Sequence, residues 1–276
     1  MSHFFSKNFK LATLAIALTT ITLISGCVTT VSPESRLAYD KNQQALKLKP
    51  VSIISDGCVL RVEVGKDDIM YPNSDALSAS IANTLKERLT EKGVTINHVS
   101  SPFICGALTQ KELAQMDILA TEDAKDAVNT DYPVLSSSNT FDGVTNQAYL
   151  NLYTALVNAK KPSADNMKTA ANTPLNLDNA SLNTIRKIEG ANKVFVILAT
   201  ANKQSFGLKM AAASTSPLAG ALINRAPGSG YWIHLVNLET NQIEWTKTGA
   251  IQGNVFKMPV DNSYTLPKML DPLYPE

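Results

Sequence analysis

An alternation of apolar strand, amphipathic helix and apolar strand over residues 59–99 most constrains the fold of this chain. Residues 59–64 are rich in aliphatic side chains, which is typical of a buried strand. Leucine or isoleucine then recurs every fourth residue, which predicts a helix with one apolar stripe, formed by Leu77, Ile81, Leu85 and Leu89. Gly93 suits the end of that helix, and residues 94–99 form the next strand. A strand, helix and strand in this order predict a crossover unit in which the helix packs on a sheet.

Two boundaries around this unit can also be predicted. Residues 51–54 are apolar and form an earlier strand, separated from residues 59–64 by Ser55-Asp56-Gly57, which is typical of a turn. Asn73 or Ser74 is suited to cap the helix, since a short polar side chain can accept from the first free backbone N–H groups.

The C-terminal half repeats the alternation of helix and strand. An apolar helix over residues 182–188 ends at Gly190. Residues 193–198 follow and are apolar on both faces, which predicts a central strand of a covered sheet. Residues 231–238 and 242–248 flank a short polar loop and predict a β-hairpin. The fold class is therefore α/β, with a mixed sheet covered by helices and a C-terminal β-hairpin.

The middle of the chain is less regular. Residues 110–180 are expected to be a polar, partly helical insert in an α/β domain that spans residues 51–258. One amphipathic helix is predicted there, with Val144, Ala148, Leu152 and Leu156 on its apolar side. Residues 259–276 carry four prolines and form a tail expected to run over the surface.

The N-terminus has the order of a secretory signal. Lys7 and Lys10 precede an uncharged apolar run over residues 11–24, and the small residues Ser25 and Gly26 come before Cys27. The run of 14 residues is shorter than the roughly 20 that a helix needs to cross a bilayer. Alternatives are an uncleaved anchor, or a chance cysteine beside an ordinary cleavage site.

Ile24-Ser25-Gly26-Cys27 resembles the bacterial lipobox. That resemblance implies removal of residues 1–26 and acylation of the Cys27 thiol, which would then be the mature N-terminus. Because Val28 and not Asp follows, the resemblance implies lipid anchoring at the periplasmic face of the outer membrane. Residues 27–50 are expected to be a lipidated tether that holds the domain away from the headgroups.

The charge balance argues against nucleic acid as a partner. The whole chain has 25 basic and 24 acidic residues, and two of the basic residues lie in the signal. A chain without net positive charge and without a long basic cluster has no field that attracts a polyanion such as DNA or RNA.

Two cysteines remain once Cys27 is assigned to lipid. Cys58 and Cys105 both lie beside glycine, and in an oxidising compartment the simplest expectation is one disulfide that closes a long loop. A metal site or a catalytic thiol is an alternative, although no further Cys or His lies at ligand spacing and no base is adjacent.

The crossover unit over residues 59–99 and the segment from Leu182 through the hairpin resemble a group of periplasmic lipoproteins. The group includes the curli-secretion channel subunit and the penicillin-binding-protein activator lipoproteins, and its shared core resembles the N-terminal domain of the Tol-system β-propeller protein. Leu235-Val236-Asn237 and Ile243-Glu244-Trp245 match the group's hairpin, with Asn241 in place of its usual glycine. Asn241 also tolerates a positive φ. Residues 110–180 depart from the pattern.

The resemblance implies a non-catalytic scaffolding or accessory role in envelope assembly or secretion. Its partners would be the membrane, through the lipid anchor, and an envelope protein or further copies of the chain. The group includes ring-forming secretion subunits, which cross the membrane by lipid-facing hairpins. Around Phe206 and Leu208 apolar residues alternate as in such a hairpin, but the sequence has no second hairpin to match, which argues against an integral pore.

Four side chains are candidates for partner contact, namely Trp232, Trp245, Phe206 and Leu208. The two tryptophans could instead lie on one face of the hairpin and pack against the central strand. The stretch around Phe206 and Leu208 could be a loop whose apolar stripe docks on the domain itself.

Motifs of enzymes and cofactor sites are missing from the sequence, which has no G-x-S-x-G elbow, no H-E-x-x-H and no P-loop. After the signal only His98 and His234 remain, the first expected on a loop and the second packed in a strand. We therefore expect no catalytic residue, no metal and no cofactor. The alternative is a periplasmic ligand-binding or hydrolytic lipoprotein with its site in the insert and the 203–230 segment.

Overall fold

The computed structural model describes residues 33–62, 67–120, 135–137, 141–159, 173–204, 228–251, 253–260, 269, 270 and 273. The chain divides into two compact units, Met1–Leu37 and Ala38–Glu276. The larger unit contains every strand that the structure describes.

The described strands form one mixed sheet of ten strands. The order along its main path is β5–β2–β1–β8–β9–β10–β7, while β3 and β4 pair with β1, and β6 pairs with β4. The bounds are β1 Val51–Val62, β2 Asp68–Met70, β3 Ile96–Val99, β4 Phe103–Ile104, β5 Asp117–Leu119, β6 Leu135–Ser136, β7 Thr173–Pro174, β8 Lys193–Gln204, β9 Gly228–Asn237 and β10 Gln242–Ala250. The predicted α/β class with a mixed sheet is confirmed.

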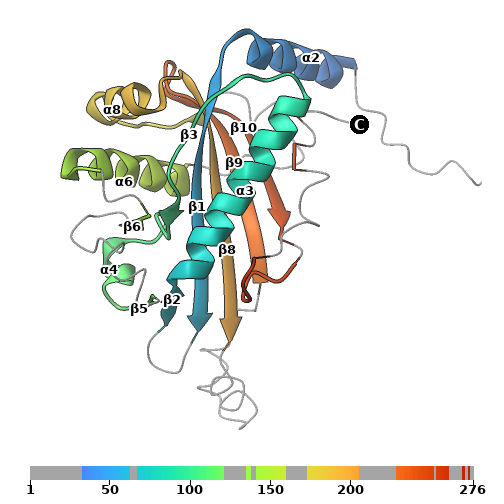
Figure 1. The fold of residues 1–276 in the computed structure, drawn as a ribbon. Coiled ribbons are helices and arrows are strands. Elements are labelled where there is room, and N and C mark those ends of the chain that lie inside the picture. Colours follow the sequence, from blue (N-terminus) through green and yellow to red (C-terminus); the bar gives the residue numbers. More distant parts are fainter. Residues whose placement is uncertain are drawn as a thin grey trace, which may run out of the picture. The chain divides into compact units, whose positions relative to one another are not determined.

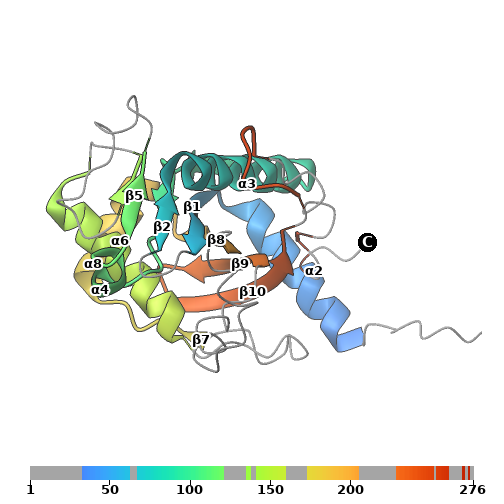
Figure 2. The ribbon, with the colours of Figure 1, turned by 90° about the horizontal axis from the view of Figure 1, so that it is seen from below.

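The long strands β1, β8, β9 and β10 lie side by side in that order (Figure 2). β1 and β8 are parallel and in register over their whole length, from the pair Val51 and Lys193 to the pair Val62 and Gln204. β9 and β10 then form the predicted antiparallel hairpin. At its turn Asn241 has a φ of 54°, the left-handed conformation expected at this position.

Helices cover both faces of the sheet. Their bounds are α2 Pro33–Leu48, α3 Tyr71–Glu91, α4 Gln110–Leu113, α6 Gly143–Asn158 and α8 Asn179–Glu189. Figure 1 shows α3 on one side of β1, and α6 and α8 on the other. The side chains of β8 explain this arrangement, because Phe195 and Ile197 pack in the cluster of α3, whereas Val194 and Val196 pack in the cluster of α6 and α8. A strand that is apolar on both faces must be covered twice.

The structure corrects the prediction that Ser55-Asp56-Gly57 is a turn, because β1 runs through these residues as one strand of twelve. A Cβ atom at Gly57 would lie 2.1 Å from the backbone oxygen of Ser74 in α3. Glycine is needed here because α3 approaches β1 too closely for a side chain, and not because the chain turns.

The helix α3 also begins earlier than its polar residues suggest. It starts at Tyr71, and its N-cap Met70 makes no side-chain capping bond. Ser74 lies within the first turn, where its hydroxyl donates to the Met70 carbonyl (2.9 Å) and accepts from the Val59 N–H (2.9 Å). The predicted apolar stripe from Leu77 to Leu89 is confirmed, since all four side chains are fully buried.

The end of the expected tether is helical and packs on the domain. In the larger unit, from Ala38 on, α2 buries Leu46 in the core, and the Gln43 amide donates to the Leu273 carbonyl (3.0 Å). Met269 and Leu273 of the Pro-rich tail are fully buried in the same core cluster. Segments from before and after the predicted domain therefore pack on it.

The insert contributes to the core through α6. Three of its side chains, Tyr149, Leu152 and Tyr153, are fully buried against β8 and α8. The predicted helix is confirmed, with Asp142 as N-cap accepting from the Thr145 N–H (2.7 Å), but Val144 of its predicted apolar side is 70% exposed.

Candidate functional site

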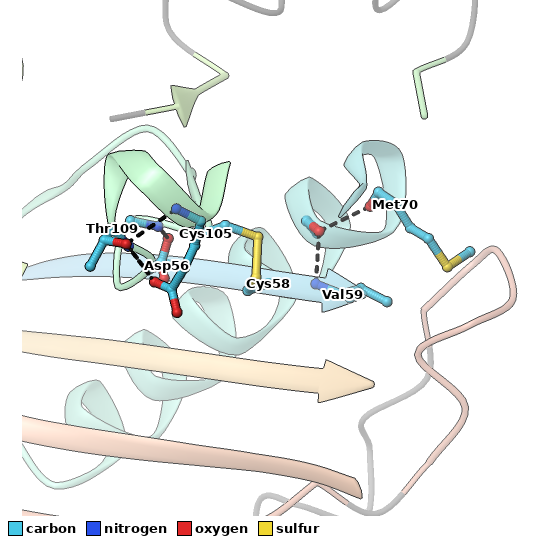
Figure 3. The surroundings of a disulfide bond; sticks show 9 residues. Asp56, Cys58, Val59, Met70, Cys105 and Thr109 are labelled. Carbon is cyan, nitrogen blue, oxygen red and sulfur yellow. Dashed lines mark hydrogen bonds between the residues drawn. A yellow bond between two sulfur atoms is a disulfide. The ribbon is translucent and has the colours of Figure 1, made fainter. Parts of the chain in front are cut away.

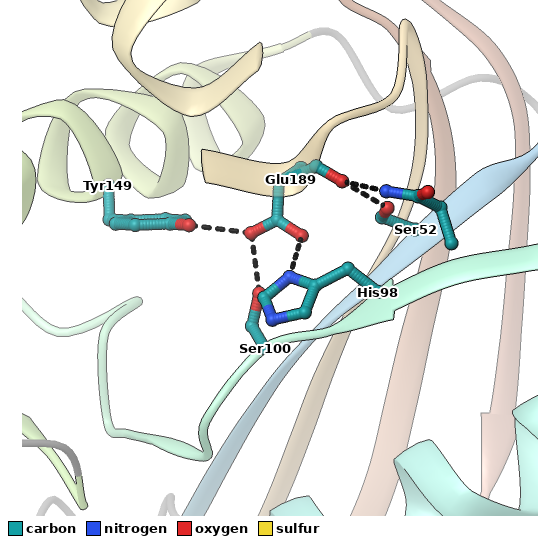
Figure 4. Close-up of polar contacts among 6 residues, drawn as sticks. Ser52, His98, Ser100, Tyr149 and Glu189 are labelled. Atoms are coloured by element: carbon teal, nitrogen blue, oxygen red, sulfur yellow. Dashed lines mark hydrogen bonds and ion pairs between the residues drawn. The ribbon is translucent and has the colours of Figure 1, made fainter. Parts of the chain in front are cut away.

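Glu189, the last residue of α8, is fully buried at the centre of a polar cluster (Figure 4). One carboxylate oxygen, Oε1, accepts from the Tyr149 hydroxyl (2.6 Å) and from the Ser100 hydroxyl (2.5 Å). The other, Oε2, lies 3.1 Å from Nδ1 of His98. Burial and the neighbouring Glu189 charge raise the pKa of Tyr149 far above its ordinary range, so this hydroxyl stays a donor.

The backbone of Glu189 belongs to the same cluster. Because Glu189 ends the helix, its backbone carbonyl has no hydrogen-bond partner within α8. It accepts instead from the Ser52 hydroxyl in β1 (2.8 Å) and from the Asn97 amide in β3 (2.7 Å). The cluster thus joins α8 to both strands and to α6.

The geometry of the cluster is not that of a nucleophilic triad. In a triad the base contacts the nucleophile directly and the acid lies behind the base. Here Glu189 lies between His98 and Ser100, and the Ser100 hydroxyl donates to the carboxylate and not to the imidazole. Ser100 is also buried, so its hydroxyl is closed to a substrate. The arrangement can hold the helix end in place, but it does not activate a nucleophile.

His234 is a packed residue of β9, as the sequence predicts. Its Nδ1 lies 2.8 Å from the Thr246 hydroxyl across the hairpin. Burial lowers the pKa of His234 to about 4, because the imidazolium would lose its hydration. His98 lies in β3 and not on the expected loop, and it pairs with Glu189. The two histidines have separate partners.

A second buried acid lies beside the disulfide. Cys58 of β1 is joined to Cys105, which follows β4, and this agrees with the pairing expected from the sequence (Figure 3). The next residue, Gly106, donates its backbone N–H to Oδ1 of Asp56 (2.7 Å). The disulfide therefore holds the loop that satisfies one oxygen of the buried carboxyl group.

The other oxygen of Asp56 has no hydrogen-bond partner among the described residues, and neither does the hydroxyl of the buried Tyr153. Burial raises the pKa of Asp56 to about 7, although the backbone N–H groups of Gly106 and Ala107 oppose the shift. The sequence could not reveal this acid, because an aspartate before a glycine is far more common in turns than in a covered strand.

The predicted contact residues are in different situations. Cys27, Phe206 and Leu208 lie outside the described residues. Trp245 is only 3% exposed and packs edge to face on Phe195, so the structure contradicts its assignment to a contact surface. Trp232 is half-buried.

The two tryptophans do not share a face of the hairpin. Trp245 is paired with Leu235, which lies three residues from Trp232, and an odd separation along a strand places two side chains on opposite faces. Accordingly, Trp245 packs in the cluster of α3, and Trp232 packs against that of α6 and α8. A register shift between Ile243 and Trp245 determines which face of the sheet Trp245 occupies, and this shift cannot be deduced from the sequence alone.

The outer edge of β10 is a candidate contact surface. β7 pairs with β10 only at Gln242 and Ile243, so in the described part of the chain the rest of β10 pairs with β9 alone. A strand with one neighbour directs about half of its backbone N–H and C=O groups away from the sheet. The edge at the other end, β5, has only three residues.

Within the described ranges, no three His, Cys, Asp or Glu side chains are grouped so that they could hold a metal ion. The helices found there are too short or too polar to cross a membrane.

No family model matches the chain, and no curated protein matches it. Among solved structures, the chain is similar to the C-terminal domain of LpoB from Salmonella enterica at 11% sequence identity. The match covers 78% of this chain and 98% of that domain, with a TM-score of 0.24.

Proposed function

We propose that this chain is a non-catalytic lipoprotein, anchored through Cys27 at the periplasmic face of the outer membrane, that acts by protein contacts in envelope assembly or secretion. Its address rests on Ile24-Ser25-Gly26-Cys27 and the basic and apolar segments before it. The mode of action rests on one structural observation, the outer edge of β10.

This edge is suited to the addition of a partner strand. An extended peptide can pair with free backbone groups of an edge strand, and the pairing needs no catalytic side chain. Natural edges are often protected by charged residues or by proline, yet residues 244–250 carry only Glu244 and Lys247 as charges. Glu244 accepts from Lys193 and Asn237 within the sheet, so Lys247 is the single protecting charge further along the strand.

The strand is also held rigidly from within. Ile243 and Trp245 are buried in the core clusters on the two faces of the sheet. A Cβ atom at Gly249 would lie 2.4 Å from the Tyr231 ring, so this side chain of β9 packs directly on the β10 backbone. A rigid edge loses little conformational entropy when a partner strand binds.

Crosslinking in intact cells tests this function. A photoreactive phenylalanine analogue replaces the exposed Thr248 of β10 in the full chain, with Cys27 retained so that the anchor can form. We expect one discrete adduct with another envelope protein, or a ladder of self-adducts if the chain assembles with itself. The matched control places the same analogue at the exposed Lys86 of α3, on the other side of the core, and should give neither product. Equal labelling from both positions, or none from Thr248, would count against contact through β10.

A further inference from the structure

A pocket of about 530 Å³ lies where the parallel strands β1 and β8 begin. Its wall is formed by the residues before β1, by the last turns of α8, by the residues that lead into β8 and by the hairpin turn after β9. The volume is within the roughly 300–1,000 Å³ that is usual for small-molecule sites. Ligands of α/β sheets usually bind at the carboxyl ends of the strands, so the fold class alone gives no reason for a pocket at this end.

The pocket is unusual in its charge. Its lining includes four basic side chains, Lys49, Arg186, Lys187 and Lys193, against the single acid Glu239. Lys193 is neutralised by Glu244 at 2.6 Å. Within the described part of the chain, the other three cations have neither an ion pair nor a side-chain hydrogen bond. Three cations without an ion pair, and one acid, therefore line one pocket of a chain whose overall charge is close to neutral.

The helix end explains only part of this charge. Arg186 and Lys187 lie in the last turn of α8, where basic residues balance the partial negative charge of about half a unit at the helix C-terminus. A partial charge of this size cannot account for two full positive charges. It also does not explain Lys49, which comes from the separate segment between α2 and β1. The Asn183 amide adds a neutral donor to the same wall, whereas the Asn192 amide donates to Glu239 (3.2 Å).

We propose that this pocket binds a phosphate-bearing ligand. Cations from two separate elements can surround an anion, and the planar guanidinium of Arg186 can donate two parallel hydrogen bonds to phosphate oxygens while the lysines supply point charges. Because the volume exceeds that of a single phosphate, the ligand carries either a second phosphate or an organic group. A soluble phosphorylated molecule and a phospholipid headgroup share this chemistry, and the pocket adjoins the segment through which the chain arrives from its N-terminus.

Titration with inorganic pyrophosphate tests the proposal. Ala38–Glu276 is a compact unit, so the chain from residue 28 onward contains all of it and lacks the acylation site. The double variant Arg186→Gln/Lys187→Gln should weaken pyrophosphate binding about a hundredfold, or roughly tenfold for each lost charged donor. The matched control Lys86→Gln/Lys111→Gln removes two exposed cations of α3 and α4 and should bind as the unaltered chain does. Thermal unfolding without ligand checks that both variants are folded.

Vesicles distinguish the two sources of the phosphate. The same chains are floated with vesicles of phosphatidylglycerol, with phosphatidylcholine vesicles as the neutral comparison. Pyrophosphate binding that depends on Arg186 and Lys187 supports a soluble ligand. A lipid headgroup is supported if the chain does not bind pyrophosphate, floats with phosphatidylglycerol vesicles but not with phosphatidylcholine vesicles, and loses this flotation in the Arg186→Gln/Lys187→Gln variant. The proposal is overturned if neither probe binds, or if the pocket and control variants lose binding equally. Loss of the β10 crosslinks would leave this result untouched, since the two surfaces are tested separately.

Discussion

Two buried groups with opposite pKa shifts predict that the stability of this protein changes little between pH 8 and pH 5. The pKa of Asp56 is raised from 3.8 to about 7, so ionisation of its carboxyl group costs stability at high pH. That cost is fully present above pH 7 and disappears as the pH falls towards 3.8. The pKa of His234 is lowered from 6.5 to about 4, so the neutral imidazole costs stability at low pH. That cost is absent above pH 6.5 and is complete below pH 4.

The magnitudes follow from the difference in bound protons between the folded and unfolded states. Between pH 8 and pH 5, relief of the Asp56 ionisation should add about 3 kcal/mol to the free energy of unfolding. Over the same interval the failure of His234 to take up a proton should remove about 2 kcal/mol. The two contributions therefore largely offset each other and leave a net rise of about 1 kcal/mol in the unaltered protein.

Single variants should reveal each contribution separately. Asp56→Asn keeps an oxygen that can accept from the Gly106 N–H, and its stability should fall by about 2 kcal/mol from pH 8 to pH 5. His234→Gln keeps a group that can bond Thr246, and its stability should rise by about 3 kcal/mol over the same interval. Urea unfolding, monitored by tryptophan fluorescence, gives the free energy of unfolding of each variant at both pH values. Because the two values compared come from the same variant, any pH-independent cost of the substitution cancels.

One result would refute this reasoning. If Asp56→Asn has the same pH dependence as the unaltered chain, Asp56 is not ionising at a raised pKa, and its unpartnered oxygen must be solvated. The m-value should be equal at the two pH values, because a change in m would mean that the compactness of the folded or unfolded state had altered.

Three further predictions concern stability and can be checked by the same urea unfolding. Replacing Cys58 and Cys105 by serine should lower the free energy of unfolding by up to about 4 kcal/mol, because a closed loop with a separation of 47 residues is released in the unfolded chain; a loss below about 1 kcal/mol would contradict this. Tyr149→Phe should cost about 1.5–3 kcal/mol, since it removes a buried hydrogen bond to the Glu189 carboxylate, and a neutral outcome would argue against that bond. Gly57→Ala should cost at least about 1–3 kcal/mol, because α3 must move away from β1, and an unchanged midpoint would disprove the close approach.

Periodicity predicted the main elements of this fold because burial acts on each of them locally. The stripe from Leu77 to Leu89 and the doubly apolar strand that begins at Lys193 needed no knowledge of their neighbours. Asn241 was likewise predictable, since a tight turn requires a residue that tolerates positive φ.

The failures have a common cause, which is that a distant partner decides the local structure. Asp56 and Gly57 look like a turn until β8 pairs alongside and α3 packs above them. Glu189 gives no signal in the sequence, because its partners His98, Ser100 and Tyr149 come from segments 40 to 91 residues away. The local pattern of residues carries no information about contacts at such separations.

The same partners also explain where function should be sought. Both buried carboxyl groups are held by donors from the fold itself, Asp56 by Gly106 and Glu189 by Tyr149 and Ser100. Glu189 and one oxygen of Asp56 are thus satisfied within the fold, and the other oxygen of Asp56 is buried out of reach of a ligand. In the described part of the chain, two sets of groups without a partner lie nearer the surface, namely the backbone of the outer β10 edge and three cations of the basic pocket. Backbone groups favour a strand and cations favour an anion, so these two surfaces should bind chemically different partners and should be separable by mutation.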